Sequence, residues 1–175
     1  NTLPPVVPID LWLSARPDQA LRAWADLPKP IAHPFSFRFW PKGAVPAENR
    51  ESLGIPDTAI VIITAGFRLH AECAPPWSDQ VLTFLDAHPT AWWVLLGAQP
   101  ERLHPSLAAH PRVRLVPPKR AATSWYAMSD IYLNPPRIGG GGSVAEAMEQ
   151  GLPVISLSDC DGGDKIGKLA VTSND

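Results

Sequence analysis

A run of four glycines, followed by a serine and a glutamate, is the part of the sequence best suited to binding chemistry. The glycines occupy residues 139–142, Ser143 follows them directly, and Glu146 stands nearly one helical turn further on. The residues after the glycines favour a helix, and the first amides of a helix have no partner within it. These amides and the helix dipole attract anions, and glycine lets a phosphate approach the backbone closely. The run therefore predicts an anion site at the start of a helix.

A capped helix is the competing explanation of the same residues. Ser143 and Glu146 fit the S-x-x-E capping box, in which both side chains satisfy free amides at a helix start. Glycines also relieve a tight turn between a strand and a helix. The run matches neither the G-x-x-x-x-G-K-[ST] pattern of a P-loop nor the G-x-G-x-x-G pattern of a dinucleotide site. On this stretch alone, the anion site and the capped helix are equally supported.

Alternating strand-like and helix-like segments predict the elements that position this site. Apolar runs typical of buried strands cover residues 58–67, 91–97, 112–116, 130–134 and 152–157. Helix-like segments lie between them, at residues 75–89, 100–111, 121–128 and 143–150. This alternation predicts an α/β fold with a doubly wound, parallel, Rossmann-like sheet. Ligands of such sheets bind outside the carboxyl ends of the strands, and the glycine run lies at one of these ends.

Composition and charge limit the classes of partner. The chain has 175 residues, of which 45% are hydrophobic and 18% charged, as is typical of a globular domain. A formal net charge of -2 gives no general attraction to nucleic acid, and we expect no nucleic-acid partner. No apolar run approaches the ~18 residues of a membrane span. Two widely separated cysteines and five histidines without ligand spacing favour a reducing, cytoplasmic compartment and no metal site.

The amino-terminal part of the sequence differs from the rest in its proline content. Residues 1–56 are rich in proline, which interrupts both helices and strand ladders. We expect them to form an arm or linker from a preceding domain. Residues 57–175 are expected to form the Rossmann-like domain, truncated at its carboxyl end. Because the chain begins at Asn1 without a methionine, we also expect it to be part of a longer protein.

The glycine run belongs to a longer pattern, GGGGSVAEAMEQGLPVI, in which G-S-x-x-E-A is followed by G-x-P-V. Three upstream segments accompany it, namely ESLGIPDTAIVIITAGFRL, HPRVRLV and MSDIYLNPP. Together, residues 50–157 resemble the donor-binding half of GT-B-fold glycosyltransferases, in particular the group 1 enzymes. The resemblance implies one Rossmann-like half of a GT-B fold. It also implies binding of a nucleoside-diphosphate sugar, by analogy a UDP-sugar, for transfer to an unknown acceptor.

The resemblance implies a role for individual residues. The diphosphate would be held by the backbone amides of Gly140, Gly141, Gly142 and Ser143, together with the Ser143 hydroxyl. Glu146 would accept hydrogen bonds from the ribose hydroxyls. Arg68 would neutralise the leaving phosphate, and Lys119 belongs to a VPPKR loop that would lie against the base. No cofactor is implied, because the nucleotide sugar is the substrate.

Two departures from the family pattern bear on activity. Ile138 stands eight residues before Glu146, where retaining relatives carry a second glutamate and inverting relatives a histidine. Its neighbour Arg137 is the candidate substitute. The lysine that usually follows the arginine of the first loop is also missing from RLHAEC, and Glu72 in this loop is expected either to pair with Arg68 or to be solvated.

The sequence leaves three functions open. In a glycosyltransferase, the acceptor site and any base would lie in a preceding domain, so we expect this stretch of chain to bind nucleotide without turnover. A nucleotide-sugar epimerase of the same fold shares the glycines, the glutamate and G-x-P-V. The third possibility is a non-catalytic relative that binds a nucleotide or a partner protein.

Overall fold

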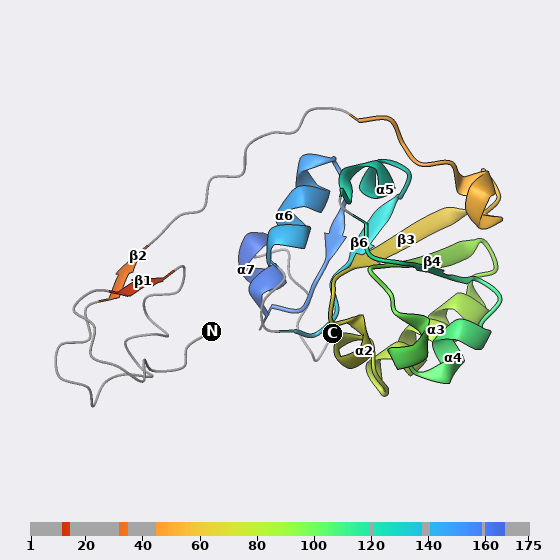
Figure 1. The fold of residues 1–175 in the computed structure, drawn as a ribbon, viewed down its shortest axis with the longest axis horizontal. Helices are drawn as coiled ribbons and strands as arrows, with labels where there is room; N and C mark the ends of the chain where they lie inside the picture. The colour runs from red at the N-terminus through yellow and green to blue at the C-terminus, as the bar shows by residue number, and fades with distance from the viewer. Residues whose placement is uncertain are drawn as a thin grey trace. The chain divides into compact units, whose positions relative to one another are not determined.

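The chain falls into two units in a computed structural model. The structure describes residues 12–14, 32–34, 45–119, 121–137, 141–158 and 160–166. One unit is Asn1–Trp40 and the other is Pro41–Asp175. In the first unit, strands β1 (Trp12–Ser14) and β2 (Ala32–Pro34) pair in parallel (Figure 1). The linker role expected for residues 1–56 stays a prediction.

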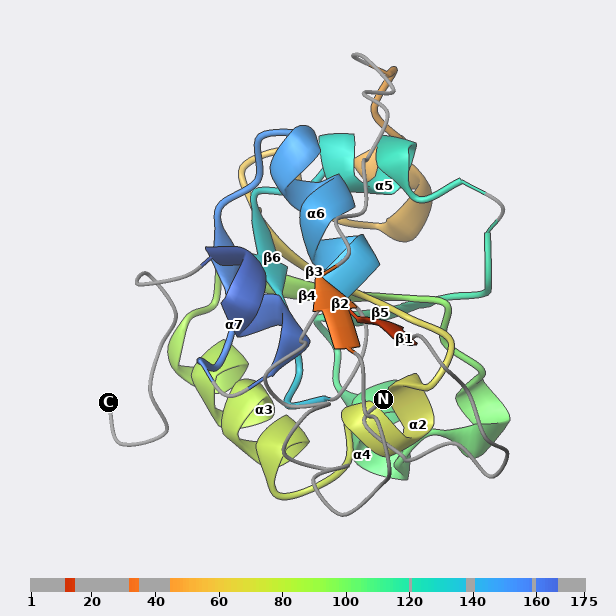
Figure 2. The same ribbon diagram turned by 90° about the vertical axis from the view of Figure 1, so that its left-hand side faces the viewer.

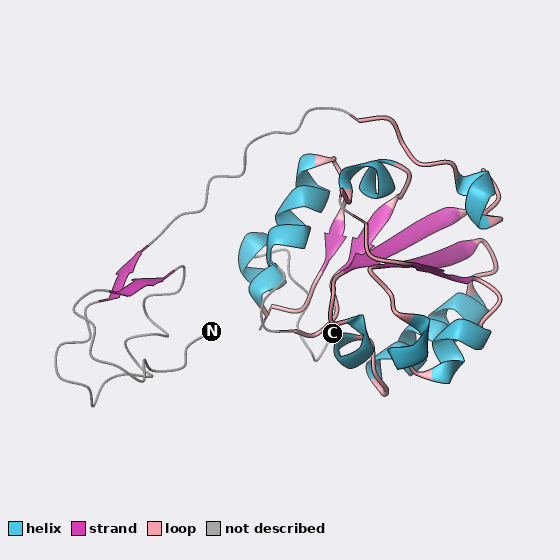
Figure 3. Ribbon diagram, viewed as in Figure 1, coloured by secondary structure: helices cyan, strands magenta, loops and turns pink. Residues whose placement is uncertain are grey.

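A five-stranded parallel sheet forms the centre of the second unit (Figure 3). Its strands are β3 (Ile60–Ala65), β4 (Ala91–Leu96), β5 (Val113–Val116), β6 (Ile131–Leu133) and β7 (Val154–Ile155). Their order across the sheet is β5-β4-β3-β6-β7. The first strand, β3, therefore lies in the middle of the sheet. Strands β4 and β5 follow on one side of it, and β6 and β7 lie on the other side. This confirms the predicted doubly wound sheet, and all five apolar runs form strands.

The central strands β3 and β4 are apolar except for Thr64, because helices cover both faces of the sheet. Strands β3 and β4 pair in register from Ile60 opposite Ala91 to Ala65 opposite Leu96. Alternate residues of each strand point to opposite faces. The core on one face includes Val61, Ile63, Val94, Leu96, Tyr132 and Val144. The core on the other face includes Ile62, Leu85, Trp93, Leu95 and Leu107.

Helices lie on both faces of the sheet, as Figures 1 and 2 show. They are α2 (Leu69–Glu72), α3 (Trp77–Ala87), α4 (Pro105–Ala109), α5 (Thr123–Ala127), α6 (Gly141–Glu149) and α7 (Asp161–Ile166). Residues of α5 and α6 belong to one core, and residues of α2, α3 and α4 to the other. Within the described part of the chain, no helix has the length and apolar character needed to cross a membrane.

The segment before β3 is anchored to the amino edge of the sheet by Arg50, in a 3-10 turn at Arg50–Leu53. Its Nε donates to the Met128 carbonyl at 2.8 Å, and its Nη1 to the Ala59 carbonyl at 3.0 Å. Its Nη2 contacts Asp130 Oδ2 at 3.0 Å. Arg50 thus ties together the starts of β3 and β6.

Candidate functional site

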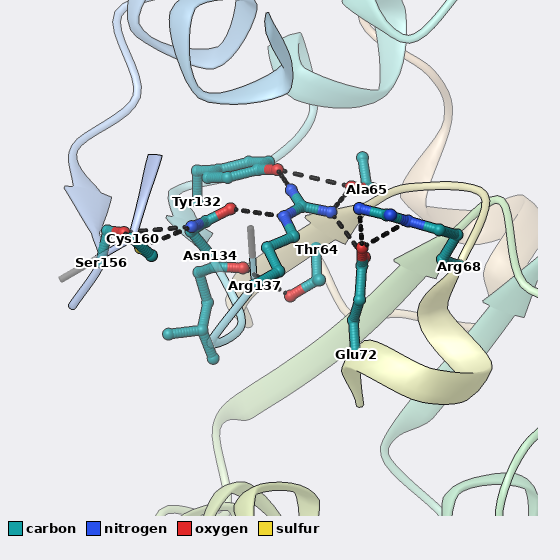
Figure 4. Close-up of polar contacts among 10 residues, drawn as sticks. Thr64, Ala65, Arg68, Glu72, Tyr132, Asn134, Arg137, Ser156 and Cys160 are labelled. Atoms are coloured by element: carbon teal, nitrogen blue, oxygen red, sulfur yellow. Dashed lines mark hydrogen bonds and ion pairs between the residues drawn. The ribbon is translucent and has the colours of Figure 1, made fainter. Parts of the chain in front are cut away.

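The candidate site lies at the carboxyl ends of β3 and β6, where the strand order reverses. The loop after β3 carries Gly66 and Arg68, and the loop after β6 carries Asn134 and Arg137. Ligands of open α/β sheets bind at such a reversal, because the loops after the two neighbouring strands diverge there. Figure 4 shows that polar side chains from these loops point toward one another.

Arg137 is the centre of this polar cluster. Arg137 as a whole is only 7% exposed, and its guanidinium makes four hydrogen bonds within the chain. Nη1 donates to the Ala65 carbonyl at 3.0 Å and to Glu72 Oε2 at 2.8 Å. Nη2 donates to the Tyr132 hydroxyl at 2.8 Å, and Nε donates to Asn134 Oδ1 at 3.0 Å. Arg137 therefore joins β3, α2 and β6 from inside the fold.

Glu72 links this buried arginine to the surface. Its Oε1 accepts from Arg68, with Nε at 3.0 Å and Nη2 at 2.9 Å, while its Oε2 faces Arg137. The side chains of Arg137 and Glu72 are 3% and 8% exposed, whereas that of Arg68 is 62% exposed. Of the two possibilities that the sequence left for Glu72, the structure shows the pairing with Arg68 and not the solvated carboxylate. Two guanidinium groups and one carboxylate leave these three residues with one excess positive charge.

The ionisation of the cluster follows from burial and from these contacts. Burial alone lowers the pKa of Arg137, but Tyr132 and Glu72 outweigh it and raise that pKa above its ordinary value. Burial also raises the pKa of Tyr132, against the opposing effects of Arg137 and of hydrogen bonding with Ser143. The arginine therefore stays charged and the phenol stays protonated.

Helix α6 begins with two glycines next to this cluster. It starts at Gly141, two residues earlier than expected, so Ser143 lies inside the helix and does not cap it. The Ser143 hydroxyl instead hydrogen-bonds with the buried phenols of Tyr126 and Tyr132. The capping-box explanation based on Ser143 is therefore wrong, because the cap residue would have to precede the helix.

The start of α6 is open at Gly142. This residue is exposed, and a Cβ atom placed on it would meet no atom of the chain within 4 Å. Just over one turn further on, Glu146 is half-buried and contributes to the raised pKa of Tyr126, after the larger effects of burial and Tyr132. The predicted site residue Gly140 lies outside the described residues, as does Ile138.

The structure brings together only part of the predicted site. Arg68, Arg137 and Ser143 are connected through Glu72 and Tyr132. Lys119, in the loop after β5, lies instead with its Nζ 5.9 Å from the centre of the Trp125 ring on α5. In the described part of the chain, no cluster of three or more His, Cys, Asp or Glu residues is suited to a metal ion.

Tyr132 and Asn134 are members of the cluster that the sequence does not single out. Asn134 Nδ2 donates to Ser156 Oγ at 3.0 Å, which extends the network to the end of β7. Asn134 and Ser156 are both buried, at 2% and 1% exposure. A polar residue directly after an apolar strand was the available signal for Asn134. Tyr132 lies within a strand, where a tyrosine is equally typical of core packing.

Comparison with known proteins gives matches at the level of structure. No protein-family model and no curated protein matches the sequence. A UDP-GlcNAc 2-epimerase from Neisseria meningitidis, solved with UDP-GlcNAc, matches with a TM-score of 0.50 and 25% identity over 66% of this chain and 33% of that chain. OtsA matches with a TM-score of 0.61 and 11% identity over 83% and 41%. The pneumococcal O-GlcNAc transferase GtfA, solved with UDP and GlcNAc, matches with a TM-score of 0.55 and 17% identity over 85% and 30%.

These matches define the fold. The chain spans between 30% and 41% of the length of these three proteins, and it has the fold of one Rossmann-like half of a GT-B enzyme. The predicted GT-B half is confirmed. Because glycosyltransferases and UDP-GlcNAc epimerases both match, the fold is shared by the two enzyme classes.

Proposed function

We propose that this chain is the nucleotide-sugar-binding half of a GT-B glycosyltransferase and binds a UDP-sugar at the start of α6. The observation that carries the proposal is the position of Gly141 and Gly142. They open a nine-residue helix at the reversal of the strand order, next to a cluster with one excess positive charge. Two of the matching structures are described as complexes with UDP or UDP-GlcNAc, which supports uridine as the base.

The chemistry assigned to the site is stabilisation of the departing diphosphate. The amides of Gly141, Gly142 and Ser143 would donate to phosphate oxygens, and the helix dipole would add to the attraction. Arg68 would neutralise charge as it develops on the distal phosphate. We assign to Ser143 only its amide, because its hydroxyl is turned toward Tyr126 and Tyr132. The acceptor site and any base would be supplied by a part of the enzyme outside this chain.

Glu146 is assigned to the ribose. It lies three and four residues beyond Ser143 and Gly142, so the two functions share one face of the helix. A carboxylate can accept from both vicinal hydroxyls, and such charge-assisted hydrogen bonds are stronger than neutral ones. The base contact proposed for the loop of Lys119 completes the donor site.

An epimerase is the second candidate function. It is favoured by the match to the Neisseria meningitidis enzyme, whose identity of 25% is the highest of the three structures. The nucleotide site would be the same in both cases. Incubation of the complete enzyme with UDP-GlcNAc, with and without glycosyl acceptors, separates release of UDP by transfer from conversion of the sugar.

Calorimetric titration with UDP tests the donor site. We expect Glu146→Gln to lower UDP affinity by about ten- to hundredfold, since a hydrogen bond to a charged group contributes about 1.5–3 kcal/mol. Glu149→Gln is the matched control on the same helix, and it should leave the affinity within about twofold of the wild type. Failure of the wild-type chain to bind either UDP or UDP-GlcNAc would refute the donor-site assignment. Binding that is unaffected by Glu146→Gln would refute the ribose role alone.

A further inference from the structure

The buried pair of Glu72 and Arg137 has no direct role in the proposed site, yet it connects β3, β6 and α2 beside that site. Arg137 binds the last carbonyl of β3 at Ala65 and two side chains at the end of β6. Its contact with Glu72 adds helix α2 to the same unit. With four hydrogen bonds made inside the chain, this guanidinium is committed to the fold.

We propose that Glu72 and Arg137 are positioning residues that hold the guanidinium of Arg68 in place for the distal phosphate of the nucleotide. This inference rests on the proposed function. The two oxygens of Glu72 are divided between the arginines, Oε1 to Arg68 and Oε2 to Arg137. Arg137 thereby fixes the carboxylate, and the carboxylate fixes Arg68.

The geometry at Glu72 restricts the orientation of Arg68 as well as its position. Both Nε and Nη2 of Arg68 contact the same oxygen, at 3.0 and 2.9 Å. Two contacts from one planar group define the direction of its plane better than one contact can. An exposed arginine without these contacts would lose more rotamer entropy on binding a ligand. The pair reduces this cost before the ligand arrives.

Gly66 leaves room for the pair. A Cβ atom at this position would lie 2.7 Å from Arg137 Nη1 and 3.3 Å from Glu72 Oε2. Its backbone amide donates to the Leu96 carbonyl at 3.0 Å, which holds it in the sheet. A side chain at the end of β3 would therefore displace the two charged groups where they meet.

Substitutions that conserve charge give the sharpest test, because the net charge of the site stays constant. Arg137→Lys keeps the charge but loses the fork that joins Glu72 to both strands. Glu72→Asp keeps the charge but is one methylene too short to contact both arginines as Glu72 does. We expect each variant to lower UDP affinity by about three- to tenfold while changing UMP affinity by less than about twofold, since UMP lacks the distal phosphate. In an Arg68→Ala background, neither substitution should lower UDP affinity further.

Arg50→Lys is the matched control. Arg50 also ties the starts of β3 and β6 together, but at the amino edge of the sheet. It should reduce stability without changing the ratio of UDP to UMP affinity. Should Arg137→Lys fail to fold, Glu72→Asp alone decides the outcome.

The outcomes separate this inference from the proposed function. If the wild-type chain does not bind UDP, both are overturned. If it binds UDP but the variants change UDP and UMP affinity equally, the positioning role is overturned and the proposed function stands. Losses that persist undiminished in the Arg68→Ala background would also overturn the positioning role, because they could not act through Arg68.

Discussion

Replacement of Arg137 by methionine is expected to lower the free energy of unfolding by about 3–5 kcal/mol, the range for breaking a buried ion pair. The variant leaves the Glu72 carboxylate, which is 8% exposed, without its buried partner. It also removes the donors to Tyr132, Asn134 and Ala65. Urea unfolding followed by tryptophan fluorescence measures the change. A loss of unfolding free energy below about 1 kcal/mol would show that the contacts of Arg137 are not needed to stabilise the fold.

Arg68→Met is the control for this prediction. It removes the other partner of Glu72, but its side chain is 62% exposed, and exposed ion pairs contribute about 0–1 kcal/mol. The difference between the two variants therefore measures the effect of burial. Replacing Glu72 and Arg137 together by apolar residues should recover part of the loss, because no charge is then left buried without a partner.

Gly97→Ala is the second substitution with a large expected effect, about 2–4 kcal/mol of lost stability. Gly97 has a φ of +97°, a conformation that residues with a Cβ atom rarely adopt. A Cβ atom there would also overlap the carbonyl oxygen of Gly66 at the end of the neighbouring strand. The same unfolding experiment measures the loss.

Gly142→Ala provides the comparison for Gly97. A Cβ atom at Gly142 meets nothing within 4 Å, and the residue lies in a helix, where alanine is preferred by about 1 kcal/mol. The stability of this variant should equal or exceed that of the wild type. Equal losses of unfolding free energy in the two alanine variants would contradict the difference in φ and in available space between Gly97 and Gly142.

The sheet could be predicted from the sequence because its signal is local. Each strand is a short apolar run bounded by glycine, proline or polar residues, as in AWWVLLG and DIYLN. Burial on both faces gives such runs, and the alternation with helices then leaves few topologies. The exact start of α6 was not predictable in this way. Serine is a favoured cap residue, but the helix begins two residues before Ser143 and so includes it.

The site was predictable only where its residues are close in sequence. Arg68 and Glu72 are four residues apart, and their pairing was one of the two possibilities that the sequence left for Glu72. Arg137 is 65 residues from Glu72 and 72 residues from Ala65, and nothing local to Arg137 indicates either contact. Arg137 was interpreted as a substitute for a polar residue only because it is next to Ile138, where the family pattern has one. Arg137 meets Ala65 and Glu72 because the strand order places β6 beside β3.

The central claim is that the diphosphate of a nucleoside diphosphate binds at the start of α6. Titration of isotope-labelled protein with UDP, followed by amide NMR spectra, tests this claim most directly. We predict the largest shifts at the amides of Gly141, Gly142 and Ser143, with smaller shifts at Gly66 and Arg68. The opposite result would be an unchanged spectrum, or largest shifts around the apolar pocket that Trp77, Phe84 and Ile155 line on the α3 face of the sheet. Either outcome would contradict the donor site proposed for this chain.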